Sequence, residues 1–301
     1  MPIFLPEHSD SLGTGTEGQW EPGSGLAQPR GLECVWVYNG LVMHDRSIMD
    51  KYRIVDIDGL WSPDVRDSRE QNPADHGEQA GAAFYGGKGI TIHGFVECGN
   101  IPKMRDMQQA LAGAFSGIEE QPLVARTNDI NNDVFVNVRL AQNISMKESQ
   151  DNQWARREFL IPLRASDPRI FSWIEHDVSA SIVGGNVASF IISNRGNFPA
   201  RPRIILTGPL SGSITVRNLD TGSVLAFWDV ESIGSGEYIT TEFLLGKKIM
   251  TDAAGNRAFG KMDTVNSSRT FEIRPFQTDR VEVTAGSGSG SVQIFWRDTW
   301  I

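Results

Sequence analysis

The chain has 301 residues, of which 40% are hydrophobic and 22% charged, a composition typical of a globular protein of about two domains. Its formal net charge is -9 and it has no long basic run, which disfavours direct nucleic-acid recognition because phosphate contacts need clustered Lys and Arg. No apolar stretch approaches the roughly 18 residues of a membrane span, and the start lacks the basic and apolar regions of a signal peptide. We therefore expect a soluble protein that does not contact a membrane.

Residues 1–30 are rich in Gly, Ser, Pro and Glu. Such a segment buries too little apolar surface to offset the entropy that ordering costs. Two interpretations stay open for this stretch: a disordered tail, or an arm that becomes ordered on a partner subunit.

The next part of the chain, residues 31–97, contains three strand signals and one long polar stretch. Residues 34–38 are apolar and end at Asn39-Gly40, a turn pair, while 52–58 and 90–97 alternate between apolar and polar residues. The intervening residues 61–81 are polar and interrupted by Pro and Gly, which predicts a long loop.

One helix is predicted, over residues 100–116. Asn100 can cap its N-terminus, and Pro102 falls where its missing N–H is not needed. Apolar residues recur at helical spacing and Gly117 can end the helix, so we expect one face to pack on a sheet. The apolar face consists of Met104, Met107, Leu111, Ala114 and Phe115.

A long hairpin is predicted over residues 133–165, from strands at 133–145 and 154–165. Because a long hairpin presents an edge to which another chain can pair, its alternating apolar residues are our candidates for a subunit interface. These candidates are Val134, Val136, Val138, Phe159, Ile161 and Leu163. Asp167-Pro168 ends the hairpin, which closes an N-terminal β domain of residues 31–168; residues 169–180 are predicted to be a linker.

The remaining residues, 181–301, contain short strand signals separated by turns. This spacing predicts a C-terminal β-sandwich or jelly roll, so the expected fold class is mainly β. The predicted strands are 187–193, 203–207, 213–218, 223–230, 238–244, 270–273, 280–284 and 291–296, with Gly-rich turns that include 286–290.

The two cysteines, Cys34 and Cys98, lack Cys-x-x-Cys spacing, so we interpret them as small apolar residues in or near the core. A disulfide between them stays open as an alternative. The five histidines also lack the spacing of a zinc site, so no metal-binding residue is predicted. They are His8, His44, His76, His93 and His176.

No catalytic or cofactor-binding constellation is found, and the chain is predicted not to be an enzyme. Asp56 and Asp58 lie on one face of a predicted strand, where two carboxylates could serve glycoside hydrolysis, but two solvent-facing acids are the commoner arrangement. The Gly-rich stretch 286–291 precedes a strand and not a helix, so it lacks the helix N-terminus that would bind a phosphate.

Exposed aromatic rings on a sandwich can stack on sugars, which makes Trp228, Trp296 and Trp300 worth considering. Trp296 follows the alternating Val292 and Ile294 and is assigned to the core. Trp228 and Trp300 are therefore the two candidate glycan contacts.

The chain resembles the distal tail proteins of long-tailed, non-contractile bacteriophages. The resemblance covers the chain after its Gly-rich start and rests on the order of features and on local motifs. The motifs are 57–60 (IDGL), 86–94 (GGKGITIHG), 194–202 (NRGNFPARP), Gly208-Pro209, 218–222 (NLDTG) and 292–297 (VQIFWR).

The resemblance implies a structural protein of the virion tail tip. It implies a hexameric ring made by the N-terminal β domains, with the hairpin as a belt, and outward galectin-like C-terminal sandwiches. The implied partners are the tail tube protein, the tail-associated protein of the tail tip and receptor-binding proteins. The alternative from the residues themselves is a module that binds host cell-wall carbohydrates through the sandwich.

Overall fold

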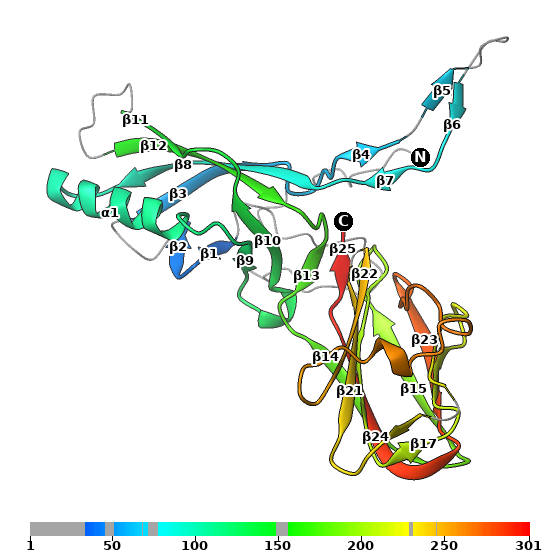
Figure 1. Cartoon of the computed structure of the whole chain (residues 1–301). Helices are drawn as coiled ribbons and strands as arrows, with labels where there is room; N and C mark the ends of the chain where they lie inside the picture. Colours follow the sequence, from blue (N-terminus) through cyan, green and yellow to red (C-terminus); the bar gives the residue numbers. More distant parts are fainter. Residues whose placement is uncertain are drawn as a thin grey trace, which may run out of the picture.

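The computed structural model describes residues 34–45, 51–67, 69–71, 78–148, 156–228, 231–244 and 246–301. The predicted Gly-rich segment 1–30 lies outside these residues. The fold is mainly β, with one α-helix, and two β domains lie one above the other in Figure 1. The predicted fold class is confirmed.

The N-terminal domain is built on a folded sheet with strand order β2-β1-β9-β10-β12-β8-β3. Three more strands extend it: β11 pairs with β12, β13 with β10, and β25 with β13. The strands are β1 (Val35–Tyr38), β2 (Leu41–Met43), β3 (Lys51–Asp58), β8 (Lys88–Glu97), β9 (Gln121–Arg126), β10 (Val134–Leu140), β11 (Ser145–Glu148), β12 (Arg156–Ala165), β13 (Ile170–Ser172) and β25 (Thr299–Trp300).

Helix α1 (Ile101–Ala114) forms where the sequence predicts it. The Asn100 side chain accepts a hydrogen bond of 2.9 Å from the Lys103 N–H and so caps the helix. Leu111 and Phe115 are buried, and the Phe115 ring stacks on Tyr38 of β1 at 4.3 Å between centroids. No helix in the described ranges is long and apolar enough to cross a membrane.

Cys34 and Cys98 are both buried in the N-terminal core, and no disulfide joins them. The prediction of two core cysteines is confirmed, and the disulfide alternative is wrong.

The predicted hairpin is only partly present. The strand expected over 133–145 ends at Leu140, and β11 begins at Ser145. β10 pairs with β12 at only two positions and otherwise pairs with β9 and β13, while β11 continues along β12. β12 pairs with β8 on its other side, so it lies inside the sheet and is not an edge.

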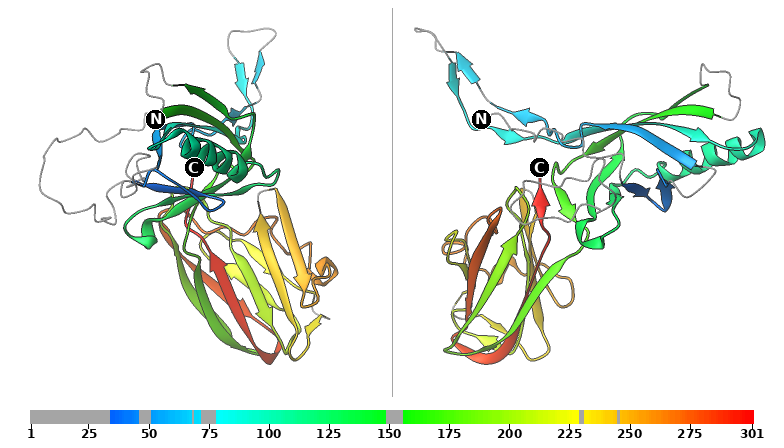
Figure 2. Two further views of the ribbon diagram at one scale, coloured as in Figure 1. Left: turned by 90° about the vertical axis from the view of Figure 1, so that its left-hand side faces the viewer. Right: turned by 180° about the vertical axis from the view of Figure 1, so that it is seen from behind.

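The predicted loop over 61–81 contains strands, and that prediction is wrong. β4 (Val65–Arg66) pairs with β7 (Phe84–Tyr85), and further out β5 (Arg69–Gln71) pairs with β6 (Glu78–Ala80). These pairs make a ribbon, here called the projecting arm, that extends away from both domains in Figures 1 and 2. The sequence here is polar and does not alternate, because the side chains of β4 and β7 are exposed and do not join a core.

The predicted linker over 169–180 is also largely strand. β13 takes Ile170–Ser172, and β14 (His176–Val183) pairs with the sandwich from its first residue. Arg169 is buried and its guanidinium bonds to Asp167, which fixes the chain as it leaves β12. Only residues 173–175 connect the two domains at this point.

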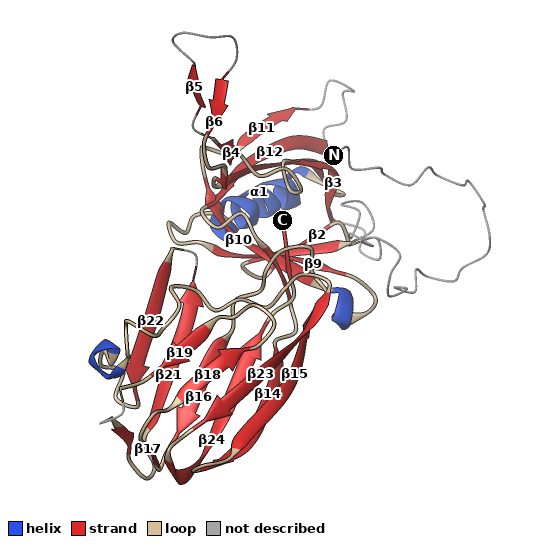
Figure 3. Cartoon of the chain, turned by 90° about the vertical axis from the view of Figure 1, so that its right-hand side faces the viewer, coloured by secondary structure: helices blue, strands red, loops and turns tan. Residues whose placement is uncertain are grey.

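The C-terminal domain is the predicted β-sandwich, and Figure 3 shows the strands of its two sheets overlapping. One sheet has the order β15-β23-β18-β19; the other has β20-β17-β24-β16-β21-β22, with β14 on β24. The segment expected as a strand at 270–273 is reduced to a bridge between Ile273 and Ala200. The strands are β15 (Val187–Asn194), β16 (Arg203–Thr207), β17 (Leu210–Ser211), β18 (Thr215–Asn218), β19 (Val224–Ala226), β20 (Ser232–Ile233), β21 (Tyr238–Leu244), β22 (Lys247–Asp252), β23 (Gln277–Thr284) and β24 (Ser287–Trp296).

Two short 3-10 turns complete the described structure, η1 (Ile130–Asn132) and η2 (Phe259–Lys261). The Gly-rich turn predicted at 286–290 is mostly part of β24, which starts at Ser287. Gly290 lies inside the sheet, where an added Cβ would meet the Thr207 carbonyl oxygen at 2.1 Å. The glycines therefore allow close strand packing as well as a turn.

Candidate functional site at the domain junction and the strand edges

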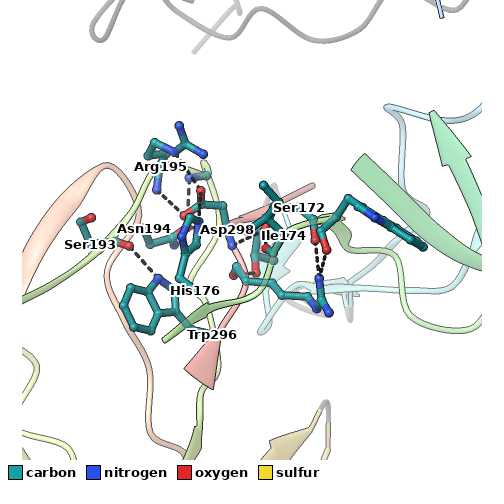
Figure 4. Close-up of polar contacts among 12 residues, drawn as sticks. Ser172, Ile174, His176, Ser193, Asn194, Arg195, Trp296 and Asp298 are labelled. Atoms are coloured by element: carbon teal, nitrogen blue, oxygen red, sulfur yellow. Dashed lines mark hydrogen bonds and ion pairs between the residues drawn. The ribbon is translucent and has the colours of Figure 1, made fainter. Parts of the chain in front are cut away.

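A buried carboxylate, Asp298, joins the two domains (Figure 4). Its side chain is 1% exposed and accepts hydrogen bonds from His176 Nε2 at 3.1 Å and from Arg195 Nε at 2.9 Å. The Arg195 backbone N–H donates to its other oxygen at 2.9 Å. A charge this deeply buried is stable only with such partners.

These hydrogen bonds also set the protonation of Asp298. Burial by itself raises the pKa of the carboxyl, but the bonds from His176 and Arg195 outweigh it and hold the pKa below its usual value. Asp298 is therefore a carboxylate at neutral pH.

The turn after β15 wraps around the end of the chain. Asn194 is buried, and its side-chain oxygen accepts from the N–H groups of Gly196 and Thr299. The Thr299 carbonyl in turn accepts from the Phe198 N–H at 3.0 Å. An added Cβ at Gly196 would lie 1.8 Å from that carbonyl oxygen, so only glycine fits here.

This arrangement delivers the last strand of the chain to the other domain. β25 leaves the sandwich after β24 and pairs with β13, which pairs with β10 in the N-terminal sheet. Ser172 N–H donates to the Asp298 carbonyl at 2.9 Å, and Ser172 Oγ accepts from the Asp298 N–H at 3.0 Å. The chain thus crosses between the domains twice, after β13 and after β24.

The base of the projecting arm rests on the same turn. The Tyr85 ring lies edge-on to Phe198, with 6.0 Å between centroids. Next to it, Lys88 is fully buried and donates to the Leu60 carbonyl at 2.6 Å. Burial lowers the pKa of Lys88 to about 8, although Asp167 acts in the opposite direction. The base of the arm is therefore held in place by the packing of Tyr85 and by the buried Lys88.

Among the described strands of the N-terminal domain, β3 and β11 each have an open edge. Within the described residues, β3 pairs with β8 alone and ends the sheet order, and β11 pairs with β12 alone at the other end of the β11-β12-β8-β3 layer. Val55 of β3 has no partner in the register because a bulge lies between Ile54 and Asp56, and its side chain is 54% exposed. Open edges of this kind can pair with another chain.

The six predicted interface residues face the core. Their exposed fractions range from 0% to 9%, and all six belong to the core cluster of the N-terminal domain. Their alternation reflects packing inside the domain, so assigning these side chains to a subunit interface is wrong. The residues concerned are Val134, Val136, Val138, Phe159, Ile161 and Leu163.

The two predicted glycan contacts, Trp228 and Trp300, lie in different domains. Trp228 is 39% exposed in a loop of the sandwich. Trp300 lies in β25, opposite Ile170, and packs against the core of the N-terminal domain. Trp300 therefore does not belong to the sandwich surface. Trp296 is buried as predicted, and its Nε1 donates to the Ser193 carbonyl at 2.8 Å.

The acidic pair Asp56 and Asp58 is exposed on β3. The Asp58 carboxylate lies 3.3 Å from His93 Nε2, and Asp56 accepts from the Ile57 N–H at 2.8 Å. Within the described residues no group of three or more His, Cys, Asp or Glu could hold a metal ion.

The sequence contained one overlooked signal for the junction. Asp298 continues the inward alternation of Val292, Ile294 and Trp296, all of which are buried. A carboxylate that points into a core needs a charged or hydrogen-bonding partner. The alternation of these residues therefore predicts that Asp298 forms a buried ion pair. The sequence near Asp298 does not identify the partner residues, because Arg195 lies 103 residues away in the chain.

Comparison with solved structures shows what this fold is similar to. The chain matches the crystal structure of the Dit protein (gp 19.1) of phage SPP1, described as a paradigm of the hub adsorption apparatus in phages that infect Gram-positive bacteria. The TM-score is 0.64 with 11% sequence identity, over 89% of this chain and 99% of that chain. The chain therefore has the fold of that protein in both domains.

Two baseplate structures of phage P2, in the activated conformation with calcium and with strontium, match with TM-scores of 0.45 and 0.43. Each has 12% identity and covers 81% of this chain and 90% of that chain. No protein-family model and no curated protein sequence matches the chain.

Proposed function

We propose that the chain is the distal tail protein of a long-tailed bacteriophage, a structural part of the virion tail tip that joins the tail tube to the adsorption apparatus. The observation that carries this proposal is the shared fold with the Dit protein of phage SPP1 along 99% of that protein's length. A mainly β fold without a catalytic arrangement among the described residues suits a structural part that holds other tail proteins in place.

The proposed assembly is a closed ring of six copies. A ring needs two different surfaces on each copy that fit one another. The open edges of β3 and β11 supply such a pair, because they end the same layer of sheet at opposite sides. Pairing β3 of one copy with β11 of the next would continue the sheet from copy to copy.

The projecting arm is the second proposed contact. Its base exposes Val65, Phe84 and Tyr85, which are 60%, 65% and 45% exposed in the single chain. Exposed apolar side chains on a ribbon that leaves its own domain are expected to be covered by a neighbour. This moves the proposed belt from the hairpin predicted over 133–165 to the projecting arm.

The junction around Asp298 gives the hub its stiffness. Two crossings of the chain and a buried ion network resist rotation of the sandwich against the ring domain. In this arrangement the ring domain would contact the tail tube protein and the tail-associated protein, and the sandwich would carry receptor-binding proteins. The galectin-like character of the sandwich belongs to this proposal.

The test is assembly in solution with the neighbouring tail proteins. Native mass spectrometry of the purified chain, alone and with the tail tube protein of the same phage, is expected to show a closed multiple of the 33.2 kDa chain that binds the tube protein. A chain that stays monomeric at high concentration and does not bind the tube protein would refute the proposal.

A second candidate function is carbohydrate binding by the sandwich, which the exposure of Trp228 favours. It is compatible with a role in the hub. Glycan-array binding that disappears in Trp228→Ala but survives in Val265→Ala, a change at another exposed apolar residue of the sandwich, would support it. Absence of binding by the wild-type chain would exclude it for the glycans on the array.

A further inference from the structure

The smaller sheet of the sandwich ends at β15. Within the described residues, β15 pairs with β23 over its whole length, from Val187 to Asn194, and with no other strand. Figure 3 shows β19, β18, β23 and β15 following one another, with β15 at the margin of the domain. The backbone groups on the outer side of an edge strand are a template for pairing with a further strand.

The other edge strands among the described residues of the sandwich have features that oppose such pairing. β22 carries Lys247, Lys248 and Asp252, β14 carries Asp177, and β19 and β20 have only three and two residues. The sequence of β15, VASFIISN, contains no charged residue and no proline, and its register with β23 has no bulge. Charges, prolines, bulges and short strands are the usual protection of an edge, and β15 has none of them.

Two apolar side chains of β15 are exposed to solvent. Val187 is 57% exposed and Ile191 is 75% exposed. Phe190 and Ile192 lie in the core of the sandwich, so Val187, Ser189 and Ile191 share the outer face of the strand. An unprotected edge with exposed apolar side chains is expected to pair with another chain.

The outer face of β15 is complementary to itself. When two copies of the strand pair antiparallel about Ser189, Val187 of each copy lies opposite Ile191 of the other. The two Ser189 side chains then lie opposite each other on a two-fold axis. Apolar side chains therefore meet apolar ones, and small hydroxyl groups meet each other, as favourable cross-strand pairs do.

Neighbouring registers fit less well. Pairing about Phe190 would place Ile191 opposite Ser189, and pairing about Ile191 would place Val187 opposite Arg195, beyond the end of the strand. The order of side chains thus favours one register, and it favours a second copy of this chain as the occupant.

The surroundings of β15 permit this pair. The strand ends at Asn194, which bonds to Thr299 at the domain junction, so antiparallel copies place their N-terminal domains at opposite ends of the pair. Glu282 of β23 lies opposite Ser189. It would be three strand spacings, about 14 Å, from Glu282 of the other copy. At physiological salt, where the Debye length is roughly 8 Å, the repulsion between these two carboxylates is screened.

We propose that the open edge of β15 pairs antiparallel with β15 of a second copy about a two-fold axis at Ser189. The four-stranded sheets of the two sandwiches then continue into one another. One strand pair buries little surface, so the association is weak and depends on concentration. A two-fold contact joins copies in pairs and cannot close a ring, so this inference does not rest on the proposed function.

The test traps the pair of full-length chains with a disulfide, formed by mild oxidation with diamide. In S189C the two thiols lie opposite each other, with Cα atoms about 4.5–5.5 Å apart, which a disulfide can bridge. S193C is the matched control, because it is exposed on the same face but lies about 27 Å from its copy in this register. The wild-type chain reports any linkage through the buried Cys34 and Cys98.

Non-reducing electrophoresis should show S189C as linked pairs of the 33.2 kDa chain, with at least tenfold lower yield from S193C and the wild type. Adding I191K to S189C places a charge in the contact and should lower the yield at least fivefold. Because Ile191 is exposed, this variant should keep the thermal unfolding of S189C. V265K, at an exposed residue elsewhere on the sandwich, should leave the yield unchanged.

Hydrogen exchange gives a second readout without cysteine. The amides of residues 187–193 should become protected as the concentration of the wild-type chain rises. Protection that appears only when a receptor-binding protein is added would assign the edge to that protein and overturn the proposal.

Three results of the disulfide test would also overturn it. These are no linked pairs from S189C, equal yields from S189C and S193C, and a yield from S189C that I191K does not lower. Failure of ring assembly together with linkage through S189C would count against the proposed function and leave this contact supported.

Discussion

Arg195 and Asp298 lie 103 residues apart in the sequence yet share two hydrogen bonds, one from the Arg195 backbone N–H and one from its guanidinium, each 2.9 Å long. Through them the first turn after β15 holds the strand that returns to the N-terminal domain. The motif 194–202 contains no reactive groups. It therefore has a structural role, which is to hold the connection between the two domains; we call it the clasp.

Removing the Asp298 charge is expected to destabilise the protein. D298N leaves Arg195 without its buried partner, and breaking such a pair costs about 3 kcal/mol. Denaturant unfolding followed by fluorescence should show this loss. D177N, at an exposed acid of β14, is the control and should change the stability by less than about 0.5 kcal/mol. Equal stability of D298N and the wild type would contradict the role of the clasp.

Filling the space at Gly196 is expected to open the junction. G196A puts a Cβ against the Thr299 carbonyl, so β25 must move and the free energy of unfolding should fall by about 3 kcal/mol or more. The matched change G113A in α1 meets no atom within 4 Å and should stabilise the chain by about 0.5–1 kcal/mol. Thermal unfolding of both variants measures the contrast; a G196A variant as stable as G113A would show that the close approach is not required.

The buried Lys88 should make stability depend on pH in the alkaline range. Burial lowers its pKa to about 8 in the folded chain, whereas the unfolded value is near 10.5. Between these values the unfolded state binds more protons, so stability rises with pH, by up to about 2–3 kcal/mol from pH 8 to 10.

The check on this prediction is the difference between variants. K88M should lack the rise in unfolding free energy between pH 8 and 10, whereas K247M, at an exposed lysine of β22, should keep it. If K88M and the wild type show the same slope, the amine does not lose its proton in the folded protein.

Asp298 should make the free energy of unfolding depend on pH in the acid range. Its pKa is lowered in the folded chain, so its contribution is complete above the unfolded value near pH 4 and is lost as pH falls through the folded value. The stability difference between wild type and D298N should therefore shrink below pH 4. A difference that stays constant down to pH 2 would show that other groups set the acid limit.

A charge at the open edge of β3 is expected to block assembly without unfolding the chain. V55E changes an exposed residue that has no partner in the register, so the fold should tolerate it. Sedimentation should then show single chains under conditions where the wild type is expected to form rings. V265E, at a residue that is 82% exposed on the sandwich, should still assemble. Rings of normal size from V55E would remove β3 from the interface.

The elements predicted best are those whose cause is local. Asn100, Pro102 and the apolar face defined α1 to within two residues, and alternation defined most of the sandwich strands. Cys34 and Cys98 were placed in the core from their spacing alone.

The elements that were predicted wrongly have one physical cause in common. Their structure depends on partners that are distant in the sequence. Alternation at Val134 and Phe159 indicated a strand but not whether the covered face belonged to the same chain or another. The arm has strands without a core to mark them, and the predicted linker is ordered by pairing with β10 and β24.

Electron microscopy of the assembled full-length chain can show whether the proposed ring is closed by the edges of the N-terminal sheet. We expect closed rings of six copies in which β3 of one copy lies beside β11 of the next, with the sandwiches outside. Single chains, open filaments, or rings joined through the sandwiches would contradict it.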